Sequence, residues 1–308
     1  MRQLLTAVAV AVFLTFIAPA VPTAAPAASG PCGTASASST HYTHVLWIWE
    51  ENRTYSSIVG SKNAPYINSL ASACGLATNY HNVTHPSLPN YMAATSGLPL
   101  GGLSPFATDC RPTTRCSTNA PSIFSQVSGW KAYEETMPSD CDKRNSGTYL
   151  VRHNPPAYYT TLAGCSTNDV PYTQLKSDLA GGKLPAFSFV TPNAADDMHG
   201  GTTLAGDKWL ASNLPAILGS SAYTSGTLAV FITWDEGAGG TATDCATNTT
   251  DVGCHVPTLV ISPSTKPGTA SSTLFNHYSL LATAESLLRV PALGSAAMAS
   301  SMVSAFNL

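Results

Sequence analysis

The sequence predicts an α/β fold, in which helices alternate with the strands of a central sheet. Two observations support this prediction. Short apolar stretches rich in Val, Ile, Phe, Trp and Tyr alternate along the chain with longer stretches of helical periodicity. The loops between them are rich in Ser, Thr and Gly. The chain has 308 residues, of which 44% are hydrophobic, enough for one large domain with a substantial core.

The individual strands and helices follow from these patterns. The expected strands are the aromatic and β-branched runs at 44–50, 130–136, 186–191, 227–234 and 256–262. The expected helices cover residues 64–73, 88–96, 120–128, 171–180, 203–218 and 277–289. The last helix has apolar residues at intervals of three and four, which indicates one buried face: Leu280, Leu281, Ala284, Leu287 and Leu288.

The first 30 residues have the composition of a secretory signal peptide. Arg2 precedes the uncharged stretch Leu4–Ala20, and small residues follow it. We expect residues 1–30 to be removed on export and residues 31–308 to form a single secreted domain. A membrane anchor is the alternative reading, but the apolar stretch is close to the lower limit for crossing a bilayer and no later stretch reaches that length. We therefore expect no stable membrane insertion.

Eight cysteines follow this segment, and an even number in an exported chain suggests disulfide bonds. Sequence alone leaves their connectivity open. Short separations favour three bonds and leave two cysteines to form a fourth, which gives the pairs Cys110–Cys116, Cys141–Cys165, Cys245–Cys254 and Cys32–Cys74. Most of these cysteines lie in long loops, which we expect to be pinned around the functional site: 97–119, 138–170 and 237–254.

The charge balance argues against a nucleic-acid partner. The formal net charge is −3 at pH 7, and only 10% of the residues are charged. Domains that bind nucleic acid carry a basic face or stripe, and the sequence has no such cluster. We expect a small substrate instead.

Two of the expected strands end in acidic and amide side chains. Glu51 and Asn52 follow the first strand, and Asp235 and Glu236 follow the fourth, directly before Gly237. Open α/β sheets bind ligands beyond the carboxyl ends of their strands, and clustered carboxylates are costly there without a cation. These four residues therefore predict a divalent metal site. Their oxygen ligands suit Mg²⁺, Ca²⁺, Mn²⁺ or iron better than a thiolate zinc site would, and the identity of the ion stays open among these metals and Zn²⁺.

Ser87 is the candidate nucleophile for such a site. It immediately precedes the expected helix 88–96 and has Pro89 in the first turn after it. At a helix N-terminus the free backbone N–H groups and the helix dipole favour a bound phosphate. A metal ion on the serine oxygen would lower its pKa and produce an alkoxide. The alternative is that Ser87 only caps the helix, which is a common role of serine at this position.

Seven segments of the chain occur together, and in this order, in a known family. They are Glu51-Asn52-Arg53 with Gly60; His85-Pro-Ser-Leu-Pro-Asn-Tyr91 with Thr95-Ser-Gly97; Trp130-Lys-Ala-Tyr133 with Glu135 and Met137-Pro138; His153-Asn-Pro155 with Tyr158; Phe189-Val-Thr-Pro-Asn193 with Asp197-Met-His199; Thr233-Trp-Asp-Glu-Gly237; and His255-Val-Pro257 before Val260-Ile-Ser-Pro263. In these segments the chain resembles the phosphoesterase family of acid phosphatases and bacterial phospholipases C. The resemblance implies an alkaline-phosphatase-like fold, a three-layer α/β/α sandwich around a mostly parallel sheet.

The resemblance also implies a mechanism. Ser87 would attack phosphorus and form a phosphoserine that water hydrolyses, and His199 would donate a proton to the leaving alcohol. The metal ligands would be Glu51, Asn52, Asp235 and Glu236. The residues expected to bind the substrate, the first two through phosphate oxygens, are Asn90, His153 and Asp197.

Three functions are compatible with this pattern. Longer phospholipase C members of the family carry extra C-terminal sequence, so the length of this chain favours a secreted acid phosphatase acting on a small phosphomonoester. The runner-up is a phospholipase C or another phosphodiesterase, because the same metal and serine can open a diester. A more distant alternative is an exported binding protein with a structural Ca²⁺. A Gly-x-Ser-x-Gly serine hydrolase is disfavoured because the sequence lacks that motif.

Overall fold

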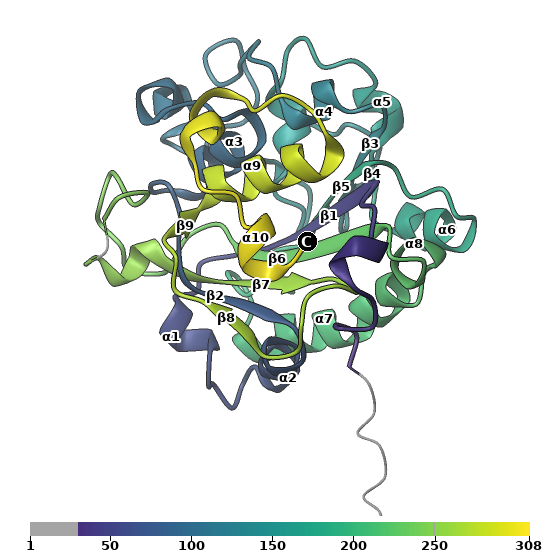
Figure 1. Cartoon of the computed structure of the whole chain (residues 1–308). Coiled ribbons are helices and arrows are strands. Elements are labelled where there is room, and N and C mark those ends of the chain that lie inside the picture. The colour runs from purple at the N-terminus through teal and green to yellow at the C-terminus, as the bar shows by residue number, and fades with distance from the viewer. Residues whose placement is uncertain (1–29, 249) are drawn as a thin grey trace, which may run out of the picture.

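A mostly parallel sheet forms the centre of the molecule (Figure 1). The computed structural model describes residues 30–248 and 250–308, so the predicted signal peptide, 1–30, lies outside the described residues except for its last position. The strands are β1 (His44–Glu50), β2 (Gly75–His81), β3 (Trp130–Glu134), β4 (Asp169–Pro171), β5 (Phe187–Thr191), β6 (Leu228–Trp234), β7 (His255–Ile261), β8 (Thr269–Ser271) and β9 (Phe275–Asn276). Their order is β4-β3-β5-β1-β6-β7-β2-β8, with β9 paired to β2. From β4 to β6 all neighbours are parallel, whereas β7 is antiparallel to both β6 and β2.

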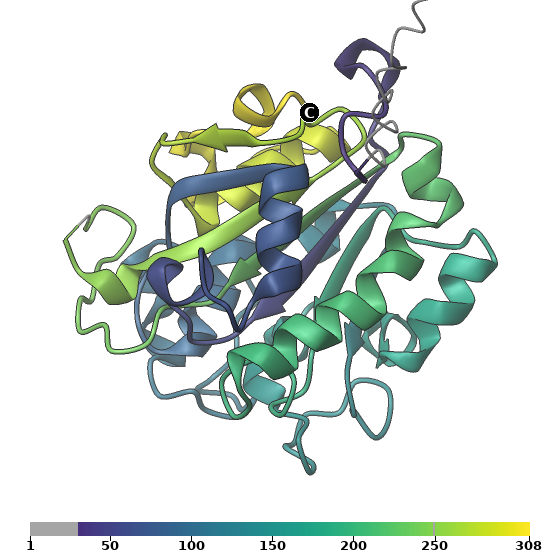
Figure 2. The same ribbon diagram turned by 90° about the horizontal axis from the view of Figure 1, so that it is seen from below.

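Helices cover both faces of this sheet (Figures 1 and 2). One face carries α2 (Pro65–Ala73) and α7 (Thr203–Leu218), with α6 (Thr173–Ala180) beside α7. The opposite face carries α3 (Ser87–Ser96) and α9 (His277–Leu288). Shorter helices lie at the periphery: α1 (Tyr55–Ile58), α4 (Ile123–Gln126), α5 (Cys165–Asn168), α8 (Ser221–Thr224) and α10 (Val303–Phe306). The arrangement is the expected three-layer sandwich. Within the part of the chain that is described, no helix has the length and apolar character needed to cross a membrane.

The core lies around the two central strands, β1 and β6. Every residue of β6 and all but the first of β1 are buried, as expected for parallel strands covered by helices on both faces. Trp47 meets the edge of Phe187 at a centroid distance of 4.8 Å, and Trp49 stacks on Phe189 at 5.7 Å. In the parallel register Glu50 lies opposite Trp234. The residues that follow these two strands therefore emerge side by side at one edge of the sheet.

The differences from the predicted elements lie at the sheet edges and in the loops. Strand β2 was not predicted, because its sequence, Gly-Leu-Ala-Thr-Asn-Tyr-His, lacks both β-branched apolar residues and a clear alternation. The three-residue β4 covers the end of the predicted loop 138–170 and the first residue of the predicted helix 171–180. The helix predicted over 120–128 covers only α4, because the chain turns to an extended conformation at Val127.

Four disulfides cross-link the described part of the chain. They join Cys32 to Cys74, Cys110 to Cys116, Cys141 to Cys165 and Cys245 to Cys254. These are the four predicted pairs, three favoured by their short separations and Cys32–Cys74 formed by the two remaining cysteines. The first ties the N-terminal segment to the end of α2, and the other three close long loops, each within one of the predicted loop segments.

Candidate active site

Ser87 begins α3 and lies almost completely buried at its N-terminus. Its hydroxyl donates a hydrogen bond to Glu51 Oε2 at 3.2 Å and accepts one from Asn52 Nδ2 at 3.4 Å. The preceding residue, Pro86, is the N-cap, and no side chain caps the helix from that position. The candidate nucleophile therefore contacts two of the four predicted metal ligands.

Asn90 lies one turn into the same helix, behind the nucleophile. Its Oδ1 accepts from the backbone N–H groups of Val83 and Thr84, and its Nδ2 donates to the carbonyls of Thr84 and Pro86. The side chain is fully buried and both of its amide atoms are used by the backbone. The structure does not support the predicted phosphate contact of Asn90. Its side chain instead fixes the loop that presents Ser87.

Two acidic residues meet where β1 and β6 end. Asn52 adopts a positive φ of 49°, which turns the chain after Glu51 so that the Asn52 N–H donates to Asp235 Oδ1 at 3.0 Å. The Asn52 side chain donates to Glu51 Oε2 at 2.9 Å. Glu51 and Asp235 are both fully buried. Among the residues that the structure describes, Asp235 Oδ2 has no hydrogen-bond partner.

The electrostatics of these acids fit a bound cation. Burial raises the pKa of Glu51 to about 8, and the charge of Asp197 adds to the rise, while the Tyr91 hydrogen bond opposes it. Burial also raises the pKa of Asp235 well above its ordinary value, with contributions from Glu51 and Glu236. Carboxylates in this position are held ionised most effectively by a positive charge between them. The orphaned oxygen of Asp235 and the all-oxygen donor set therefore suit a hard divalent ion.

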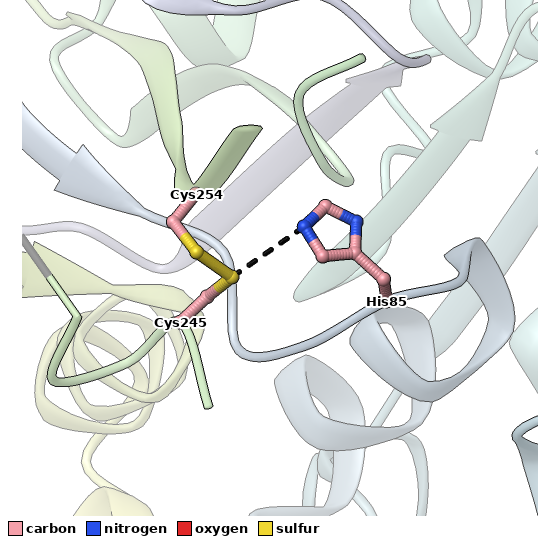
Figure 3. A group of neighbouring side chains, drawn as sticks. All are labelled: His85, Cys245 and Cys254. Atoms are coloured by element: carbon pink, nitrogen blue, oxygen red, sulfur yellow. Dashed lines mark hydrogen bonds between the residues drawn. A yellow bond between two sulfur atoms is a disulfide. The ribbon is translucent and has the colours of Figure 1, made fainter. Parts of the chain in front are cut away.

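Glu236, the fourth predicted ligand, is turned towards His85. The two side chains form a hydrogen bond in which His85 Nδ1 lies 2.5 Å from Glu236 Oε2. The other ring nitrogen lies 3.5 Å from the sulfur of Cys245, next to its disulfide with Cys254 (Figure 3). These three residues are close enough to share a metal ion, but the disulfide removes the thiolates that such a site would need. His85 lies two residues before Ser87, and its pairing with Glu236 was not predicted from the sequence.

His153 and Asp197 form a buried layer beside Glu51. His153 Nε2 lies 3.2 Å from Glu51 Oε1, and its Nδ1 lies 3.5 Å from Asp197 Oδ2. The imidazole stacks on Tyr91, whose hydroxyl also donates to Glu51 Oε1. Burial lowers the pKa of His153 well below its ordinary value and raises that of Asp197 to about 6. Both predicted residues therefore lie in the site, and Tyr91, to which the sequence analysis gave no role, joins them.

His199 lies on the open side of the cluster. Its side chain is 43% exposed, and its Nδ1 lies 3.5 Å from Glu51 Oε2, the oxygen that also accepts the Ser87 hydrogen bond. The His199 backbone N–H donates to Asp197 Oδ1 at 2.8 Å, which fixes the turn that carries the ring. An exposed imidazole beside the candidate nucleophile can exchange protons with a substrate and with water.

Sequence comparison identifies the family. The model of the phosphoesterase family matches residues 60–291. The chain belongs to the phosphoesterase family. It is 30% identical over 270 residues to the phosphatidylinositol-3-phosphatase of Mycobacterium tuberculosis, covering 85% of this chain and 82% of that protein. It is also 30% identical over 258 residues to an acid phosphatase of Aspergillus fumigatus, covering 80% of this chain but only 55% of the relative.

Solved structures agree on the fold of this phosphoesterase. A protein of the alkaline phosphatase superfamily from Vibrio parahaemolyticus superposes with a TM-score of 0.55 at 15% identity, covering 82% of this chain and 69% of that one. The protein therefore has an alkaline-phosphatase-like fold and, as a phosphoesterase, is a hydrolase of phosphoric ester bonds. Members of the family and superfamily generally use divalent metals.

Proposed function

We propose that this phosphoesterase is a secreted, metal-dependent acid phosphatase that hydrolyses small phosphomonoesters through a phosphoserine at Ser87. One observation carries the proposal. The Ser87 hydroxyl, Asn52 Nδ2 and His199 Nδ1 all contact the same oxygen, Glu51 Oε2, at the N-terminus of α3. A nucleophile, an acidic ligand and a proton carrier thus meet where a helix favours phosphate. The names of the relatives, an acid phosphatase and a phosphatidylinositol-3-phosphatase, support cleavage of monoesters.

Glu51, Asn52 and Asp235 would hold the metal ion, with Glu236 as the fourth ligand. Asp235 contributes the unpartnered Oδ2. Asn52 would contribute Oδ1. Its side-chain amide would rotate by about 180°, so that the oxygen takes the place of the nitrogen that now faces Glu51 and Ser87. His85 would orient Glu236 as an outer partner. When bound, the ion would lower the pKa of the Ser87 hydroxyl and offset the charge that develops on the phosphate.

The residues of the chain account for both steps of a double displacement. In the first step the Ser87 oxygen, as the alkoxide, forms a bond to phosphorus while the bond to the leaving oxygen breaks, and His199 donates its proton to that oxygen. In the second step water attacks the phosphoserine, His199 accepts a proton from the water, and Ser87 leaves as the alkoxide. Tyr91 donates a hydrogen bond to the other oxygen of Glu51, and the His153 ring lies beside that oxygen.

Two observations support secretion. The N-terminal 30 residues have the signal-peptide pattern. The described chain also holds four disulfides, and such bonds form and persist in oxidising compartments.

Phosphate release from an aryl phosphomonoester tests the proposal. The mature protein would be assayed from about pH 4 to about pH 9, with chelator and after addition of single divalent metals. Ser87→Ala should abolish turnover. Ser96→Ala is the matched control, because Ser96 is a buried serine at the other end of the same helix, and it should retain turnover. Activity that survives chelation or the Ser87 substitution would contradict the mechanism, and activity confined to diesters would move the assignment to a phosphodiesterase.

A further inference from the structure

Arg152 is a partly buried cation at the edge of the acidic cluster. It lies in the short 3-10 turn Val151–His153, directly before the buried His153. Its side chain is 21% exposed, and its Nε lies 3.8 Å from Asp109 Oδ2, beyond hydrogen-bond range. Within residues 30–248 and 250–308, that Nε has no hydrogen-bond partner. A guanidinium group with unused donors is therefore held close to the site.

Asp109 links Arg152 to the N-terminus of α3. Its Oδ1 accepts the backbone N–H of Leu88, the residue after Ser87, at 2.9 Å. The loop is fixed around it: Asp109 has a positive φ of 50°, and the next residue, Cys110, forms a disulfide and accepts a hydrogen bond from the Tyr158 hydroxyl through its carbonyl. Arg152 is thus separated by a single carboxylate from the first turn of the helix that begins with the nucleophile.

Arg152 also lies next to the residues that surround the nucleophile. It directly precedes His153, whose Nε2 lies 3.2 Å from Glu51 Oε1 and whose Nδ1 lies 3.5 Å from Asp197 Oδ2. Arg152 therefore places a positive charge beside a cluster whose proposed metal ligands are acidic or neutral. A planar guanidinium binds phosphate oxygens through parallel hydrogen bonds, and its attraction grows with the charge on the phosphate.

We propose that Arg152 binds the terminal oxygens of the substrate phosphate and makes the enzyme selective for dianionic monoesters over monoanionic diesters. This inference rests on the proposed function, because it concerns the phosphate that Ser87 attacks. A monoester has three unsubstituted oxygens where a diester has two, and it carries about one more negative charge than a diester at neutral pH. The Asp109 carboxylate, 3.8 Å from the guanidinium, attracts it electrostatically towards the N-terminus of α3.

The test compares two substrates with the same leaving group, an aryl phosphate and the methyl aryl phosphate diester. Arg152→Met should lower kcat/KM for the monoester by roughly 10- to 100-fold and change the diester value by less than about 3-fold. Competitive inhibition by inorganic phosphate should weaken by a similar factor. Arg152→Lys keeps the charge but loses the fork, so it should give a smaller loss that is again selective for the monoester.

Arg144→Met is the matched control. Arg144 lies 3.9 Å from Asp142 in the same loop segment, but its side chain is 80% exposed, so its substitution should leave both kcat/KM values unchanged. Equal losses on the two substrates in Arg152→Met would mean a structural role and overturn the inference, as would no loss on either. If the wild-type protein turned over neither substrate with any divalent metal, the proposed function itself would fail. If the wild type turned over the substrates but Arg152→Met kept the wild-type ratio of monoester to diester kcat/KM, only this inference would fail.

Discussion

Two groups of buried acids in this protein differ in how their charge is balanced. Asp178 of α6 lies 2.6 Å from the Lys131 ammonium and accepts further hydrogen bonds from Tyr133 and Gln174. Burial alone would raise its pKa, but these partners outweigh that effect and lower it. Asp235 lies deeper in the protein and has two further acids near it, and its pKa is raised. One acid is satisfied by the fold, whereas the other keeps an oxygen available for a ligand.

The comparison separates structural acids from functional ones. A satisfied acid contributes to folding and has no reason to be near a nucleophile. An unsatisfied acid destabilises the fold, so its presence indicates a ligand that compensates the cost. Glu51 and Asp235, two buried acids whose pKa values are raised, lie near Ser87 at the carboxyl ends of the central strands.

Substituting one acid from each group should have opposite consequences. Asp235→Asn should lower kcat for an aryl phosphomonoester by at least roughly 10²- to 10³-fold, because a metal ligand is lost, with little loss of metal-free stability. Asp178→Asn should leave kcat nearly unchanged and lower the free energy of unfolding by about 2 kcal/mol, because its charged hydrogen bonds are lost. Steady-state kinetics and urea denaturation measure the two effects. Equal losses of stability in the two variants, with activity retained in both, would contradict the distinction between structural and functional acids.

The role of His199, on the exposed side of the acidic cluster around Ser87, can be tested by substitution. If His199 protonates the leaving alcohol, His199→Ala should slow an alkyl phosphate by roughly 10²- to 10⁴-fold and an activated aryl phosphate much less, since a good leaving group needs little help from an acid. His41→Ala, which changes an exposed histidine, is the control. Equal slowing of both substrates would argue that His199 only shapes the pocket.

Removing the contact between His85 and Glu236 should lower activity less than removing a metal ligand. His85→Gln removes the imidazole that orients Glu236, and we expect metal affinity to fall by roughly 10- to 100-fold with the maximal rate at saturating metal largely retained. Titration of the metal-free protein with a single divalent ion, followed by activity, gives both quantities. A large loss of the saturated rate would instead place His85 in direct contact with the substrate.

The same acids should make the stability of the metal-free protein depend on pH. The pKa of Glu51 rises from 4.5 to about 8 on folding, so the folded state binds more protons than the unfolded state between these values. Stability should therefore fall as pH rises from about 5 to about 8, by on the order of a few kcal/mol. Glu51→Gln should flatten this slope, and a divalent metal should offset the loss most at the higher pH. Thermal unfolding at several pH values would measure it, and a stability that rises over this range would contradict the predicted sign.

Much of the site could be predicted because it follows from the sheet. Parallel strands end at a common edge, so Glu51 and Asp235, each directly after an apolar run, had to emerge together. The contacts of the loops were not predictable in the same way. Nothing in the spacing of Asp109 and Leu88, or of His85 and Glu236, indicates that they touch, because loop conformation depends on disulfides and packing between distant segments. Asn90 was misassigned for the same reason: its hydrogen bonds are local and depend on the fold of the preceding loop.

The phosphoserine itself is the central claim, and it can be detected directly. Metal-loaded protein would be mixed with an aryl phosphomonoester, quenched in acid within the first turnovers, digested and examined by mass spectrometry. We predict one phosphate on the peptide that carries Ser87, absent from Ser87→Ala and from protein stripped of metal. Rapid turnover with no phosphopeptide, or with phosphate on another residue, would contradict the assignment of Ser87 as the nucleophile.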